Sequence, residues 1–125
     1  MFDTEFCHVC YRPDLYIVFM QWKKSCIGND YRDPFYFALY LLKKHRTSQL
    51  VIDVTSAFET SSNDMEWTYK EFIPTMAYTT CSQVIFIKGN TNLIFNDINT
   101  ITKEFVKYFI VYQCTTFEAA INTLY

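Results

Sequence analysis

Glycine and proline are scarce in this chain of 125 residues, which contains 2 Gly and 3 Pro. With Gly28 and Gly89 as its only glycines, the chain can form neither a glycine-rich dinucleotide-binding fingerprint nor a phosphate-binding loop. Half of the residues are hydrophobic, which excludes a disordered or low-complexity chain because so much apolar surface must be buried. We therefore expect one folded domain over residues 1–125.

An excess of basic charge is also lacking, since the formal net charge is -2. We expect no nucleic-acid partner on this ground. No apolar run approaches the roughly 20 residues that cross a bilayer, so no membrane span is expected. The start, MFDTEFCHVC, has no basic segment of a secretory signal, and an odd number of cysteines favours free thiols. Together these features predict a cytoplasmic protein.

Two hydrophobic periodicities alternate along the chain. Short apolar runs predict strands, and runs with apolar residues at i, i+3, i+4 and i+7 predict helices. The strands are expected at residues 5–11, 15–22, 48–55, 82–88 and 109–113, and the helices at residues 33–45, 65–76, from 96 to about 108, and 115–125. Only the three residues RPD separate the first two strands, so these form an antiparallel hairpin, whereas the later strands pair in parallel. The order ββαβαβαβα predicts an α/β domain with a five-stranded mixed sheet.

Local signals set the expected helix ends. Asp33 before Pro34 predicts the start of the first helix, because an Asx side chain caps free amides and proline fits the first helical position. Pro74 should kink the second helix or end its regular part at Ile73. Thr115 and Glu118 have the spacing of a capping box at the start of the last helix.

The polar stretch ETSSNDMEW, residues 59–67, precedes the second helix and admits two interpretations. Ser61 with Asp64, or Asn63 with Glu66, has capping-box spacing, so these side chains satisfy the free amides of the helix. The same amides favour an anion, which makes Thr60, Ser61 and Ser62 a candidate phosphorylation or anion-binding site. Acidic residues in that first turn would repel a phosphate, and the cap is the favoured interpretation.

Other chemistry-bearing residues give weaker signals. Asp53 ends a central strand, where ligands of open α/β sheets gather, but an acid there also caps a loop. In CHVC the side chains of Cys7 and Cys10 should point to opposite faces of a strand, so no metal site is expected. Neither His8 nor His45 is paired with a nucleophile. We therefore expect no catalytic residues, no metal and no cofactor.

Tyr36, Tyr40 and Trp67 form a candidate interface. Tyr36 and Tyr40 are spaced i, i+4 beside the inward stripe of the first helix, and aromatic residues are enriched at protein interfaces. They would line a groove or a contact between two copies of the chain. The alternative is a helix that is buried over a wide face.

The order and spacing of several segments resemble a known family. A hairpin and a helix are followed by LVIDVT, a polar stretch, DMEWTYKEFIP, SQVIFI and the closing TTFEAAINTLY. From about Leu15 to Leu124 this pattern resembles the STAS-like lone domains of bacteria, relatives of the anti-sigma factor antagonists. Its more specific parts are Asp53, the segment from Trp67 to Pro74, and FEAAINTL.

The resemblance implies a function. In that family the third strand leads into a loop whose serine or threonine is phosphorylated by a partner kinase, and Thr60, Ser61 or Ser62 occupies the matching place. We therefore expect a non-enzymatic regulatory or protein-binding module whose partner is a protein, with a homodimer as one form of it. The alternative is a small-ligand or lipid-binding domain with an apolar cavity between helices and sheet. The fold also resembles the lipid-carrying CRAL-TRIO domains, which are larger and have extra helices that this chain lacks.

Overall fold

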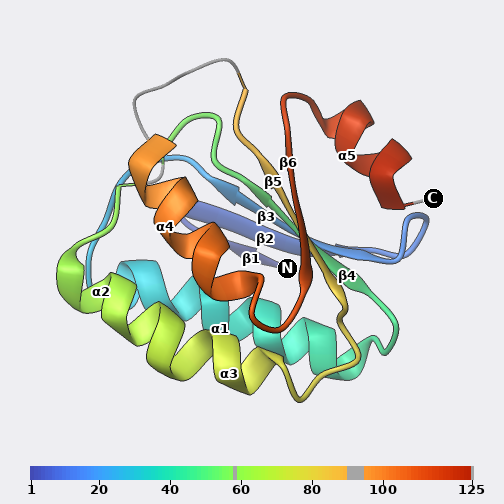
Figure 1. Ribbon diagram of the computed structural model, residues 1–125, viewed down its shortest axis with the longest axis horizontal. Helices are drawn as coiled ribbons and strands as arrows, with labels where there is room; N and C mark the ends of the chain where they lie inside the picture. The colour runs from blue at the N-terminus through green and yellow to red at the C-terminus, as the bar shows by residue number, and fades with distance from the viewer. Residues whose placement is uncertain (58, 90–94, 125) are drawn as a thin grey trace.

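The computed structural model describes residues 1–57, 59–89 and 95–124. Its centre is a six-stranded mixed sheet in the order β1-β2-β3-β4-β5-β6 (Figure 1). The strands are β1 (Phe2–Asp3), β2 (Cys7–Arg12), β3 (Ile17–Trp22), β4 (Gln49–Asp53), β5 (Gln83–Ile87) and β6 (Ile110–Cys114). The chain is thus α/β, as predicted from the alternating periodicities.

The predicted number of five strands is wrong, because β1 was missed. This strand pairs antiparallel with β2, with Phe2 opposite Val9 and Asp3 opposite His8. A strand of two residues carries no periodic signal that a sequence could reveal. Its position depends instead on the turn after it, where the Thr4 hydroxyl accepts hydrogen bonds from the backbone N–H groups of Phe6 and Cys7, both at 3.1 Å.

The predicted pairing of the other strands is confirmed. β2 and β3 form an antiparallel hairpin, and β3, β4, β5 and β6 pair in parallel in chain order. Each parallel connection is a crossover that contains helix, and crossovers of one hand between successive neighbours place their helices on one face. Accordingly α1 (Asn29–Lys44), the segment from α2 to α3 and α4 (Phe95–Phe105) share a face, and α5 (Phe117–Leu124) lies on the other (Figure 1).

Helix α1 begins earlier than the predicted start at Asp33. It starts at Asn29 and contains Pro34 in its second turn. Gly28 makes this start accessible because its φ of 66° is a conformation that side-chain-bearing residues rarely adopt. The Gly28 carbonyl then accepts hydrogen bonds from Tyr31 N at 3.1 Å and Arg32 N at 2.9 Å. The early start puts Tyr31 and Arg32 on the helix, where both contribute to the site described below.

One helical segment connects β4 to β5 and changes its geometry before Pro74. It consists of α2 (Ser62–Trp67), the π-helical turn η1 (Thr68–Phe72) and α3 (Ile73–Met76). Proline has no N–H to donate to the carbonyl of residue 70, and its ring would collide with that carbonyl in a regular helix. The wider π turn accommodates this proline. The regular helix is interrupted as predicted, but its regular part ends at Trp67 and not at Ile73.

The last helix is capped by a different threonine from the one predicted. The Thr116 hydroxyl accepts a hydrogen bond from Ala119 N at 3.1 Å, and α5 begins at Phe117. The predicted pair of Thr115 and Glu118 is therefore offset by one residue. Two neighbouring threonines offer the same chemistry, and the end of β6 at Cys114 selects the second.

Two apolar layers hold the sheet between the helices. On the face of α1 and α4, buried side chains such as Phe35, Leu42, Ile52, Phe86 and Phe105 form the larger cluster. On the opposite face a smaller cluster joins α5 to the middle strands. Strands that are apolar on both faces account for the near-continuous hydrophobic runs of the sequence.

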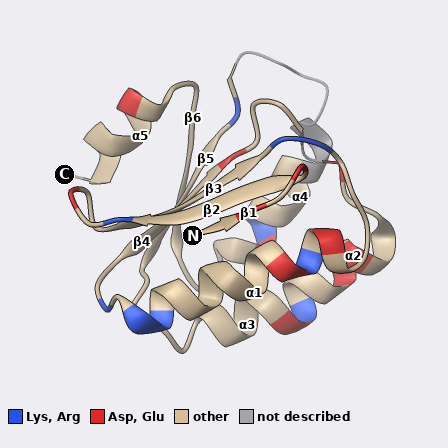
Figure 2. Ribbon diagram, turned by 180° about the vertical axis from the view of Figure 1, so that it is seen from behind, with Lys and Arg blue, Asp and Glu red and all other residues tan. Residues whose placement is uncertain are grey.

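Charged residues lie mainly on the helices and loops, with both signs intermixed around the start of α1 and α2 (Figure 2). None of the helices in the described part of the chain has the length and apolar character that would let it span a bilayer.

Candidate functional site

The loops that follow β3 and β4 lie side by side at the carboxyl ends of the strands, because neighbouring parallel strands end on the same side of the sheet. Residues from both loops line a shallow hollow of about 650 Å³. We call it the β3–β4 loop surface, and its lining residues are Ser25, Cys26, Ile27, Glu59, Thr60 and Ser61. The carboxyl ends of the strands are where open α/β sheets usually bind ligands.

Asp64 fastens the two loops to each other and to α1. Its side chain is only 2% exposed. Oδ2 accepts hydrogen bonds from Gly28 N at 2.9 Å and from Ser61 Oγ at 2.8 Å, and Oδ1 accepts one from Arg32 Nε at 3.0 Å. These donors come from the loop after β3, the loop after β4 and α1. A buried carboxylate with several charge-assisted hydrogen bonds holds such segments in one arrangement.

The environment of Asp64 favours its ionised form. Burial alone disfavours the charge, but the hydrogen bonds from Gly28, Ser61 and Arg32 outweigh burial and lower the pKa of Asp64 below its ordinary value. Arg32 is held from a second side, since its guanidinium carbon lies 5.4 Å from the centre of the Trp67 ring. Asp64 and Arg32 are therefore a charged pair at neutral pH.

Ser61 is the N-cap of α2. Its hydroxyl oxygen accepts a hydrogen bond from Asp64 N at 3.2 Å, while the hydroxyl proton is donated to Asp64 Oδ2. The predicted cap by Ser61 with Asp64 is thus present, and the Asp64 carboxylate turns to Gly28 and Arg32 instead of to the Ser61 N–H. Thr60 is half-buried and lines the hollow, whereas Ser62 is exposed as the first residue of α2.

The hydroxyl groups of Tyr31 and Thr68 form a second buried pair next to Asp64. Tyr31 Oη and Thr68 Oγ1 are 2.8 Å apart, and Thr68 Oγ1 lies 2.8 Å from the Asp64 carbonyl, to which it donates. Because Thr68 has a single hydroxyl proton, Tyr31 is the donor of the first bond. Burial raises the pKa of Tyr31, so it stays a neutral donor. The hydroxyl chain from Tyr31 fixes the turn of α2 that carries Asp64.

Asp53 caps its own loop. Its Oδ1 accepts a hydrogen bond from Thr55 N at 2.8 Å, the interpretation that the sequence favoured. In the sheet Asp53 pairs with Gln21 and Ile87, and Ile87 belongs to the cluster under α5. Asp53 therefore lies on the face opposite α1 and is not brought together with Ser61.

The predicted interface residues fall into two environments. Tyr36 and Tyr40 on α1 are 54% and 52% exposed, so they remain available to a partner. Trp67 is only 8% exposed, and its assignment to an interface is wrong. Its ring packs against Tyr31, Phe35 and Phe72 and is covered on the outside by Tyr36. The early start of α1 supplies Tyr31 and thereby encloses Trp67.

The cysteines are dispersed in the part of the chain that the structure covers. All five are free, and Cys7 and Cys10 point to opposite faces of β2, as predicted. No cluster of three or more His, Cys, Asp or Glu side chains suited to a metal occurs among the described residues. Partial burial, with Asp30 and Asp64 nearby, raises the pKa of Cys26 to about 11. The thiol on the loop surface is therefore protonated at neutral pH.

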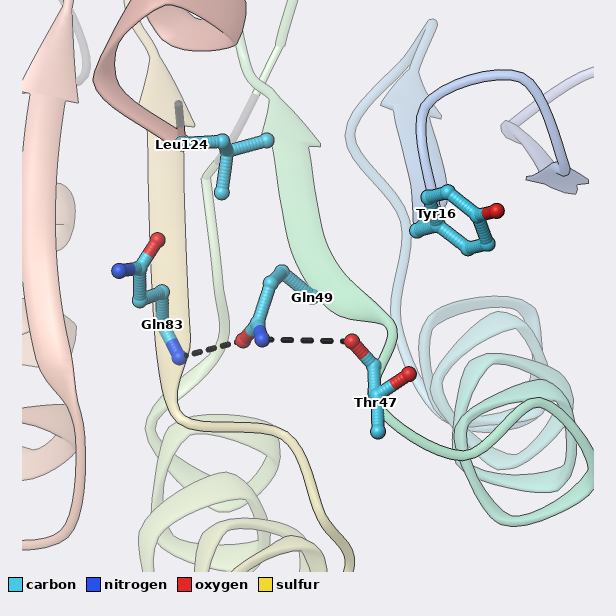
Figure 3. Close-up of a pocket in the computed structure, with 5 residues that line it drawn as sticks. All are labelled: Tyr16, Thr47, Gln49, Gln83 and Leu124. Carbon is cyan, nitrogen blue, oxygen red and sulfur yellow. Dashed lines mark hydrogen bonds between the residues drawn. The ribbon is translucent and has the colours of Figure 1, made fainter.

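A smaller pocket of about 270 Å³ lies at the opposite end of the parallel strands, beneath the end of α5. Figure 3 shows its lining residues: Tyr16, Thr47, Gln49, Gln83 and Leu124. Gln49 Oε1 accepts hydrogen bonds from Gln83 N at 2.7 Å and Ser82 N at 2.9 Å, so this side chain closes the start of β5. The pocket is distant from the loop surface and has mixed polar and apolar walls.

Sequence reasoning missed Gly28 and Arg32 as parts of the site. Asp64 was recognised only as a capping partner of Ser61. The scarcity of glycine was a usable signal, because one of only two glycines lies next to the hollow. Nothing in the local sequence indicated Arg32, whose partner is 32 residues away.

Comparisons with protein-family models, curated proteins and solved structures gave no match to this chain.

Proposed function

We propose that the protein is a non-enzymatic, STAS-like binding module that contacts a protein partner through the β3–β4 loop surface. The observation that carries this proposal is the buried Asp64, which joins both loops of that surface to the start of α1. Loops held in one conformation lose little freedom when a partner binds, so more of the contact energy appears as affinity.

The chemistry of the surface suits a protein partner. Ile27, in the loop after β3, lines the hollow and is an apolar side chain that is 71% exposed. The exposed Glu59 lines the hollow as well, together with the hydroxyl-bearing Ser25, Thr60 and Ser61. Protein contact sites usually combine apolar side chains with polar ones in this way. The element order, with a leading hairpin and the crossover helices on one face, supports the STAS-like part of the proposal.

Ser61 is the residue through which this surface would be regulated. Its hydroxyl lies 2.8 Å from Asp64 Oδ2 and donates to it. A phosphate on Ser61 removes that donor and places negative charge against a buried carboxylate, while Arg32 offers the phosphate an alternative partner. Phosphorylation would therefore release Asp64 from one of its donors and rearrange the loop surface. This matches the phosphorylated position that the family resemblance implies.

Affinity enrichment from cells that contain the protein tests the binding site. We expect wild-type protein on a resin to retain a specific partner and the Ile27→Glu variant to lose it. Tyr78→Glu is the matched control, because Tyr78 is 92% exposed and lies after α3, outside the loop surface. Equal retention by both variants would contradict the proposal.

Protein with phosphoserine incorporated at position 61 tests the regulation, with phosphoserine at position 62 as its control. We expect the first to change partner binding strongly and the second to leave it nearly unchanged, because Ser62 is exposed and, among the described residues, its side chain forms no hydrogen bond with Asp64. If both modified proteins bind as the unmodified one does, Ser61 is only a helix cap.

The small-ligand alternative remains a prediction. The pocket of Figure 3 combines the Tyr16 ring and Leu124 with two glutamine amides, a lining that suits a small amphipathic molecule. Native mass spectrometry of purified protein tests it. A bound mass that disappears in the Leu124→Arg variant would support a ligand there, and a bare protein mass would contradict it.

A further inference from the structure

The two edges of the sheet are built differently. At one edge β1 has two residues, and Asp3 on it accepts hydrogen bonds from Lys23 Nζ at 2.7 Å and from His8 Nδ1 at 3.2 Å. A short, charged strand is a common device that keeps a sheet edge from pairing with another chain. At the other edge β6 has five residues, IVYQC, and none of them is charged.

Strand β6 also exposes apolar side chains beside its open edge. Ile110 is 54% exposed and Tyr112 39% exposed, and the preceding Tyr108 is 53% exposed. Figure 2 shows β6 without charged residues. Helix α5 lies on the same face and packs Phe117 on Phe19 of β3, while Ile110 and Tyr112 remain exposed. Among the described residues, β5 is the only strand that pairs with β6.

We infer that β6 pairs antiparallel with β6 of a second copy of this chain and so forms a two-fold symmetric dimer with one continuous sheet. A filament of copies would need the β1 edge as well, and that edge is blocked. Pairing of like edges closes after two copies.

The hydrogen-bond pattern fixes the register of this dimer. Ile110 N donates to Ser82 O and Cys114 O accepts from Lys88 N, so alternate residues of β6 bond to β5. The backbone groups of Val111 and Gln113 therefore face outward. Antiparallel pairing of Val111 with Gln113 of the second copy, in both directions, uses all of these groups. Tyr112 then lies opposite Tyr112 of the second copy.

The register shifted toward the start of β6 satisfies fewer groups. A shift that pairs Val111 with itself places Gln113 opposite Phe109, whose N–H already bonds to Phe105 O at 2.9 Å.

Because the contact joins two strands of five residues, we expect it to bury no more than the lower limit of about 1,200 Å² for standard specific interfaces. We therefore expect a concentration-dependent dimer with a Kd on the order of 10 μM. Sedimentation equilibrium of the full chain across about 1 μM to 1 mM should show the transition between monomer and dimer. A wild-type protein that stays monomeric over this range would overturn the inference.

Tyr112→Lys places two like charges opposite each other at the two-fold axis and should raise Kd by at least about tenfold. Tyr36→Lys is the matched control, since Tyr36 is similarly exposed on α1, and it should leave Kd unchanged. If Tyr36→Lys dissociates the dimer and Tyr112→Lys does not, the contact lies on α1 and the inference is wrong.

A mixture of Tyr112→Lys and Tyr112→Glu proteins tests the register itself. Each variant alone should be monomeric, and the mixture should form a heterodimer, because opposite charges then face each other across the axis. Circular dichroism of each variant verifies that it is folded. Folded variants that remain monomeric when mixed would overturn the register with Tyr112 at the axis.

Discussion

Arg32 Nε donates to Asp64 Oδ1 at 3.0 Å and thereby joins the first turn of α1 to the first turn of α2. Asp64 is buried and Arg32 is one-third exposed, so the pair is shielded from water on one side only. Through Gly28 and Ser61 the same carboxylate also holds the two loops of the β3–β4 loop surface. The stability of this arrangement can be measured directly.

Replacement of Asp64 by asparagine should lower the free energy of unfolding by about 2 kcal/mol. The variant loses the charge-assisted hydrogen bonds, and its amide N–H₂ group faces hydrogen-bond donors to which it cannot bond. Glu66→Gln is the matched control. Its partner Lys70 lies on the exposed side of the same helix, and the loss should stay below about 0.5 kcal/mol. Urea denaturation at neutral pH measures both. Equal effects would show that Asp64 does not fasten the loops.

The contribution of Asp64 should depend on pH in a defined direction. Its pKa is lowered in the folded protein, so the folded state binds this proton less readily than the unfolded chain does. The stabilisation is present in full above the unfolded pKa of about 4 and is lost as the pH falls through the folded pKa. The stability difference between wild type and Asp64→Asn should thus shrink between pH 6 and about pH 3. A difference that grows on acidification would contradict this account.

Loss of the Ser61 hydroxyl should destabilise the protein even when no phosphate is involved. Ser61→Ala removes the N-cap of α2 and one donor to Asp64, and we expect a cost of about 1 kcal/mol. Ser62→Ala, at an exposed position one residue later, should remain within about 0.5 kcal/mol of wild type. Thermal unfolding of both variants distinguishes a cap at Ser61 from a surface hydroxyl.

Trp67 and Tyr36 touch, with ring centres 5.3 Å apart, but their substitutions should differ greatly. Trp67→Ala empties a buried site between α1 and α2 and should cost about 3–5 kcal/mol. Tyr36→Ala removes an exposed ring and should cost less than about 1 kcal/mol. Denaturant unfolding of the two variants tests whether Trp67 belongs to the core. Small losses of unfolding free energy of similar size in both variants would show that Trp67 is not a core residue.

The sequence was sufficient to predict the strands and helices that have a regular hydrophobic pattern. Apolar runs such as YIVFM and QVIFI identified strands because both faces of a parallel strand are covered, and the short RPD break identified the hairpin. The start of α1 was misplaced because Pro34 is a strong local signal, whereas the actual start depends on Gly28 and its contact with the distant Asp64. Strand β1 was missed because its two residues have no pattern.

Only the contacts of the site between residues close in the sequence could be predicted. Ser61 and Asp64 are three residues apart and show the spacing of a helix cap, so their contact could be predicted. The partners Gly28 and Arg32 lie 36 and 32 residues from Asp64, and the topology of the crossover alone brings them there. The same holds for Tyr31, whose hydroxyl meets Thr68 from the neighbouring helix.

Site-specific cross-linking tests the proposed binding surface most directly. A photoactivatable residue at position 27, an exposed position of the β3–β4 loop surface, is compared with the same residue at position 78, after α3. Irradiation in cells that contain the protein should give one dominant protein adduct at position 27 that unlabelled wild-type protein competes away, and no such adduct at position 78. Identical adducts at both positions, or none at position 27, would contradict a partner-binding role for this surface.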